Sequence, residues 1–128
     1  MTGEIDLLFA TGPVAARNLK TGRIRCLAVA SPKKASAFPD LPTMNTFIKG
    51  FEADNWYAMF FPKGAPQGIV NKMNQVIKTA LGNEKVTTFY KREGLDAIGS
   101  SPGELQQVFD RDINKYGDII KKAKIKVQ

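Results

Sequence analysis

Pro39-Asp40-Leu41-Pro42-Thr43 and Pro62-Lys63-Gly64-Ala65-Pro66 stand on either side of the single tryptophan of this chain, Trp56. Proline fixes φ and removes a backbone donor, so each cluster lies outside regular secondary structure and turns the chain. The segment from Phe51 to Phe61 is rich in aromatic residues and is predicted to be extended. Two turns around one extended aromatic segment indicate a crossing between two lobes.

The chain in front of these clusters is predicted to form a strand, a helix and a strand. Ile5 to Ala10 is an almost continuous apolar run, typical of a strand that is covered on both faces in a parallel sheet. A short helix is expected from Val14 to Lys20 and a second buried strand from Ile24 to Ala30. This order predicts a right-handed crossover unit with two parallel strands.

The chain behind the clusters is predicted to be mainly helical. The expected elements are a brief helix from Met44 to Ile48 behind Thr43, an amphipathic helix from Pro66 to Leu81, a helix between Asn83 and Gly94, a short strand from Leu95 to Ile98, and a long helix that opens with the capping box Ser101-Pro102-Gly103-Glu104. Asp110 and Asp112 of the long helix are interpreted as part of a solvated polar face.

The composition excludes several classes of active site. The 128 residues include no histidine and one cysteine, Cys26. A His-dependent triad, a Cys-His dyad, an intrachain disulfide and a Cys/His zinc site are therefore excluded, and we expect neither a metal nor a cofactor. The longest apolar runs are far shorter than the roughly 20 residues that span a bilayer.

The front unit is not expected to be complete in itself. A two-stranded parallel sheet leaves its outer edges unpaired and its faces uncovered, and the first predicted strand begins almost at Met1. The missing strands are expected from the absent part of a longer parent or from a second copy of this chain. The first ten residues also lack the basic region and cleavage site of a secretory signal peptide.

The order of segments resembles the C-terminal portion of the substrate-binding proteins of tripartite tricarboxylate transporters, the Bug family. The resemblance rests on Gly3-Glu4-Ile5-Asp6-Leu7-Leu8-Phe9, the run from Gly22 to Val29, Pro39 to Thr43, Trp56, Pro62 to Pro66, and Gly94. Thr46 departs from the family, whose members usually carry Glu there to complete a capping box.

The resemblance implies a fold class and a function. The fold would be α/β, a partial periplasmic-binding-protein type 2-like fold with a βαβ unit followed by a crossover strand and a helix-rich C-terminal segment. Residues 1–45 would be the tail of the second, ligand-cleft lobe, and residues 46–128 would be the hinge strand and the C-terminal part of the first lobe. A full member is a periplasmic receptor that binds a small carboxylate between its lobes and delivers it to membrane permease subunits. As a fragment, this chain is expected to bind poorly alone and to form homo-oligomers through uncovered sheet edges.

The candidate ligand-binding residues follow the two predicted strands at their carboxyl ends, where open α/β sheets bind their ligands. They are Phe9, Ala10, Thr11 and Gly12 after the first strand and Ser31 after the second. Backbone amides and a helix N-terminus suit a carboxylate there. An ordinary strand-to-helix turn with a capping threonine is the competing interpretation, and a turn-forming role is the better one for Ser31. In such binding proteins the loop corresponding to Phe9–Gly12 borders the ligand cleft, which favours the ligand-binding interpretation of that loop.

A second class of function remains open at this point. The net charge of +7 would attract polyanions, and a small basic α/β domain that binds nucleic acid or an acidic protein is the alternative. The leading interpretation includes no nucleic-acid partner, because the chain has no helix-turn-helix, zinc ligand set or ribonucleoprotein-like motif. It also includes no enzymatic activity, because no spacing gathers Asp, Glu, Lys, Ser or Tyr into a catalytic group.

Overall fold

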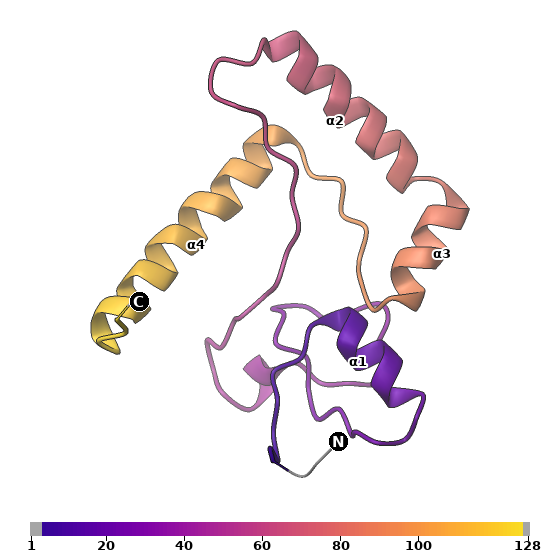
Figure 1. Ribbon diagram of the computed structural model, residues 1–128, viewed down its shortest axis with the longest axis vertical. Helices are drawn as coiled ribbons and strands as arrows, with labels where there is room; N and C mark the ends of the chain where they lie inside the picture. The colour runs from indigo at the N-terminus through magenta and orange to yellow at the C-terminus, as the bar shows by residue number, and fades with distance from the viewer. Residues whose placement is uncertain (1–3, 127–128) are drawn as a thin grey trace. The chain divides into compact units, whose positions relative to one another are not determined.

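The structure is a computed structural model, and it describes residues 4–126. Its elements, in chain order, are α1 (Gly12–Leu19), the 3-10 turn η1 (Met44–Thr46), α2 (Gln67–Leu81), α3 (Glu84–Arg92) and α4 (Pro102–Lys122) (Figure 1). The chain divides into two compact units, Met1–Tyr57 with Ala80–Ile98 and Ala58–Thr79 with Gly99–Gln128. The predicted boundary between residues 45 and 46 concerns the lobes of a full receptor and stays a prediction.

Four of the five predicted helices are present, and the expected residues cap the starts of α3 and α4. Asn83 caps α3, and its side-chain oxygen accepts a hydrogen bond from the Lys85 amide at 3.0 Å. Ser101 and Glu104 form the predicted capping box at the start of α4, with the Ser101 amide donating to Glu104 Oε2 at 2.7 Å. Each bond satisfies an amide that the first turn of a helix leaves without an intrahelical acceptor.

The predicted strands Ile5–Ala10, Ile24–Ala30 and Leu95–Ile98 are extended but do not pair with one another. Within residues 4–126 the pairing between extended segments is limited to one isolated parallel bridge, between Val29 and Thr43. The expected parallel pairing of the first two segments is therefore wrong for this chain. A strand exists through its ladder, and the segment from Ile5 to Ala10 finds no ladder partner among the described residues.

The Val29–Thr43 bridge instead joins the second segment to the turn that begins η1. The Val29 amide donates to Pro42 O at 2.9 Å, and the Met44 amide donates to Val29 O at 2.8 Å. The predicted helix from Met44 to Ile48 is only the 3-10 turn η1, and Thr43 makes no side-chain capping bond to its backbone. The absent glutamate at position 46 is consistent with this short, weakly capped turn.

The described chain buries little apolar surface. Ala15 of α1 is the hydrophobic residue that reaches the buried class among residues 4–126, at 8% exposure. The apolar residues of the first extended segment are all exposed: Ile5, Leu7, Leu8 and Phe9. The segment thus has the composition of a buried strand without the layers that would bury it.

Asp112 corrects one expectation from the sequence. It is 6% exposed rather than solvated, and its Oδ1 accepts a hydrogen bond from Arg111 Nε at 3.1 Å. Lys115 Nζ lies 3.4 Å from the same oxygen, so two cations of α4 neutralise the carboxylate. A carboxylate tolerates burial when it is paired in this way. Asp110 does lie on the exposed face, where it accepts from Gln106 Nε2 at 2.8 Å.

Candidate functional site

The predicted site loop lies at the N-terminus of α1. Thr11 is the N-cap residue, with φ −70° and ψ 156°, and its carbonyl accepts a hydrogen bond from the Ala15 amide at 3.0 Å. The Thr11 side chain makes no capping hydrogen bond. The capping-threonine interpretation is therefore wrong for the hydroxyl group, which stays available to another acceptor or donor.

The start of α1 offers backbone donors as well. The first amides of a helix have no intrahelical acceptor, and Pro13 carries no N–H, so the Gly12 and Val14 amides are the donors that this turn leaves without an intrahelical partner. The positive end of the helix dipole lies at the same place, and the first turn contains no acidic side chain. Together with the Thr11 hydroxyl, the loop presents donors and partial positive charge, which suits a small anion.

A close backbone crossing fixes the position of this loop against the end of α3. A Cβ atom on Gly12 would lie 2.1 Å from the Gly94 carbonyl oxygen, and a Cβ atom on Gly94 would lie 2.6 Å from the Gly12 carbonyl oxygen. Gly94 has φ 73°, in the left-handed region that favours glycine. The two glycines therefore let the backbone at the start of α1 touch the backbone that follows α3.

The segment 51–53 connects the two predicted parts of the site. The Phe9 ring stacks on Phe51 at 6.4 Å between centroids, and the Ala53 amide donates to Ala30 O at 3.1 Å, one residue before Ser31. Phe9 and the backbone next to Ser31 thus both contact the segment 51–53. The residues Ala10, Thr11 and Gly12 follow Phe9 directly, with Ala10 and Thr11 exposed and Gly12 half-buried.

Ser31 is used mainly for its own turn. Its hydroxyl donates to Lys33 O at 2.7 Å. This matches the turn-forming interpretation, and it leaves the Ser31 oxygen as an acceptor rather than a donor. Ser31 therefore stays a predicted site residue with a weaker case than the Thr11 loop.

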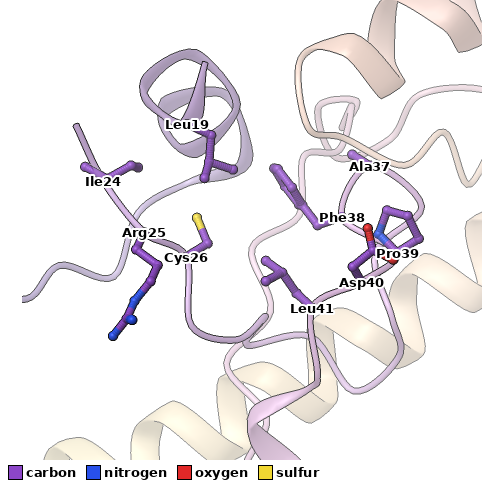
Figure 2. Close-up of a pocket in the computed structure, with 9 residues that line it drawn as sticks. All are labelled: Leu19, Ile24, Arg25, Cys26, Ala37, Phe38, Pro39, Asp40 and Leu41. Carbon is purple, nitrogen blue, oxygen red and sulfur yellow. The ribbon is translucent and has the colours of Figure 1, made fainter. Parts of the chain in front are cut away.

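A separate pocket of about 340 Å³ lies between α1 and the loop Ala37–Leu41. Figure 2 shows the side chains of Leu19, Cys26 and Phe38 turned toward a common space, while the Arg25 side chain points away from it. The predicted residues Phe9–Gly12 and Ser31 do not line this pocket. Its walls are mainly apolar, so it lacks the converging donors that a carboxylate site requires.

Residues 4–126 contain no group of three or more His, Cys, Asp or Glu side chains placed to hold a metal ion. No helix within the same range is both long enough and apolar enough to cross a bilayer. The candidate site therefore rests on backbone amides, one hydroxyl group and two aromatic rings.

Comparison with known proteins identifies the family. Residues 1–125 match the family described as "Tripartite tricarboxylate transporter family receptor". The chain belongs to this receptor family. The match covers almost the whole chain, as the resemblance in the sequence predicted.

Individual relatives of the receptor family agree with this assignment. The chain is 26% identical to the "UPF0065 protein in tcbD-tcbE intergenic region" of Pseudomonas sp. (strain P51) over 94% of this chain and 36% of that protein. Among solved structures it is similar to "R. palustris Rpa4515 with adipate", with 29% identity, a TM-score of 0.74, and coverage of 89% of this chain and 38% of that one. It is also similar to the "periplasmic binding protein BugD", with 29% identity, a TM-score of 0.73, and coverage of 89% and 39%. The predicted fold class, part of a periplasmic-binding-protein fold, is confirmed by these likenesses.

The chain thus spans between 36% and 39% of the length of these three proteins. Sequence reasoning missed two contributors to the candidate site, Phe51 and Gly94. The sequence shows Phe51 as part of an aromatic segment and Gly94 as a residue at a helix end. Their contacts with Phe9 and Gly12 join residues far apart in the chain, so these local features do not indicate them.

Proposed function

We propose that this chain provides one wall of a carboxylate-binding site in a periplasmic receptor of a tripartite tricarboxylate transporter. The ligand would be a small carboxylate such as a dicarboxylate or tricarboxylate. The R. palustris relative is named with adipate, a dicarboxylate. The role is binding without bond chemistry, so we propose no enzymatic activity.

The observation that carries the proposal is the set of donors at the N-terminus of α1. The Gly12 and Val14 amides and the Thr11 hydroxyl lie together, without an acidic side chain in that turn. Hydrogen bonds from such groups to a carboxylate are charge-assisted and stronger than neutral ones. Phe9 and Ala10 border the same loop, and Ser31 borders the turn that segment 51–53 links to Phe9.

The wider context follows from the family. Residues 1–45 would belong to the ligand-cleft lobe, and residues 46–128 would form the hinge and the end of the other lobe. Closure of the two lobes on the carboxylate would be the signal that permease subunits recognise. The location of such a receptor would be the periplasm.

A single wall is a poor binding site, so the chain alone should bind carboxylates weakly or not at all. Calorimetry with citrate and adipate tests this, and one-to-one micromolar binding to a monomer would contradict it. The isolated chain is also expected to self-associate, because it exposes apolar residues and unpaired backbone. Light scattering that found only a monomer at high concentration would refute this expectation.

The site itself is tested in a chimeric receptor, in which this chain replaces the matching part of the R. palustris adipate protein. Thr11→Val removes the hydroxyl group and keeps the shape of the side chain. Loss of one charge-assisted hydrogen bond should weaken adipate binding by roughly tenfold. Thr21→Val is the matched control, since the Thr21 hydroxyl donates to Asn18 O at the other end of α1, at 2.7 Å. Equal effects of the two substitutions would contradict the proposed site.

A further inference from the structure

Two apolar surfaces of this chain are largely exposed among the described residues. The first, called the front surface here, consists of Ile5, Leu7, Leu8 and Phe9 along one segment, with the Phe9 ring stacked on Phe51. Leu7 is 72% exposed and its neighbour Leu8 is 63% exposed. Consecutive side chains of an extended segment point to opposite sides, so apolar side chains are exposed on both sides of this segment, and its backbone forms no ladder within residues 4–126.

The second surface, called the α4 face, lies on the last helix. It consists of Phe109, Ile113, Tyr116 and Ile120, with spacings of four, three and four residues along one side of α4. All four residues are exposed, from 36% for Phe109 to 55% for Ile113. The better-covered side of the helix carries Leu105 and Val108 together with Asp112 and Lys115. On the α4 face the Phe109 ring lies 5.6 Å from the Phe60 ring, centroid to centroid, and Ile113, Tyr116 and Ile120 are exposed.

The exposed area is large for this mass. The chain of 14.1 kDa exposes 10531 Å². Two separate compact bodies with the masses of the two units would expose only about 8,100 Å², from the usual scaling of surface with mass.

The occupant of these surfaces is indicated by the relatives. The chain matches less than two fifths of each solved receptor, with TM-scores of 0.74 and 0.73. A second copy would bring the same uncovered segment and the same uncovered helix face. The unmatched part of a receptor would bring different strands and helices from the same fold.

We propose that the front surface and the α4 face dock the complementary polypeptide of a family receptor, meaning the part of such a receptor that this chain does not match, in a one-to-one complex. Backbone pairing along Ile5 to Phe9 gives the register, and the apolar side chains supply the buried area. This inference concerns assembly and holds whichever ligand the completed receptor binds.

Co-expression of the full chain with the complementary part of BugD tests the proposal, and the two polypeptides fold together in the same cell. A tag on one of them recovers the complex, and light scattering after gel filtration gives its mass. We expect one copy of each polypeptide, with slowed hydrogen exchange at Ile5–Phe9 and over the α4 face. Recovery of either polypeptide without the other, or of homo-oligomers of this chain in the presence of the complement, would overturn the proposal.

A matched pair of substitutions tests the surface. Ile5→Asp places a charge on the front surface, where Ile5 is 68% exposed, and should weaken the complex by roughly tenfold or more. Ile125→Asp makes the same change at a residue that is 54% exposed and outside both surfaces, and should leave the complex intact. Circular dichroism of each variant alone checks that the helices are retained. Equal effects of the two substitutions would place the contact elsewhere. No ligand is used, so the outcome is independent of carboxylate binding.

Discussion

Substitution of Gly12 by alanine tests the backbone crossing that positions the candidate site. The added Cβ atom would lie 2.1 Å from Gly94 O and 2.9 Å from Gly94 C. Non-bonded heavy atoms pack at about 3.5 Å, so the two backbones must separate by roughly 1.4 Å. Both obstructing atoms belong to the backbone, so no side-chain rotation relieves the clash.

The expected cost follows from overpacking. Inserting one methyl group into a tight contact typically costs about 1 to 3 kcal/mol. The backbone conformation at Gly12 is helical and adds no penalty of its own. We therefore expect Gly12→Ala to lower the free energy of unfolding by about 1 to 3 kcal/mol, and to weaken carboxylate binding in the chimeric receptor because the α1 donors move with the backbone.

Urea unfolding followed by circular dichroism measures the first effect, and calorimetry measures the second. Gly117→Ala is the matched control, because a Cβ atom at Gly117 meets nothing within 4 Å and the residue lies inside α4. Alanine in a helix interior should raise stability by about 0.5 to 1 kcal/mol. A Gly12→Ala variant as stable as the parent chain would refute the close crossing.

Three further predictions concern the supports of the two units. Asn83→Ala removes the side-chain acceptor at the start of α3 and should lower the free energy of unfolding in urea by about 1 kcal/mol. Asn55→Ala is the control and should lower it less, because Asn55 lies outside the helices and caps none of them. The hydrogen bond from the Ser101 amide lowers the pKa of the Glu104 carboxyl below its ordinary 4.5, so the contribution of the capping box is complete above pH 4.5 and is lost as the pH falls through the lowered value. Circular dichroism during an acid titration should show less loss of α4 helicity in Glu104→Gln than in the parent chain, and identical titrations would contradict the assignment. Ser36→Ala removes the hydroxyl that donates to Asp96 and should lower the free energy of unfolding by about 1 kcal/mol or less. Ser100→Ala should be nearly neutral, because Asn74 donates to the backbone carbonyl of Ser100, which the substitution keeps.

The helices and their ends could be predicted from the sequence because their determinants are local. Asn83 as a cap and the Ser101–Glu104 capping box act over three residues, and both are present as expected. The amphipathic pattern behind Pro66 likewise gave α2. Asp112 was misjudged because its burial depends on which side of α4 is covered, and the hydrophobic pattern of the helix does not determine that.

The sequence by itself determined helices α1 to α4, the family and the position of the Thr11–Gly12 loop after an apolar segment. Only the tertiary structure decided that this segment has no ladder partner in the described part of the chain, that Val29 pairs with Thr43, and that Gly12 rests against Gly94. The physical reason is the range of the interactions. Helix caps and periodicity act within a few residues, whereas a strand ladder or a glycine crossing depends on which distant backbone is there to meet it.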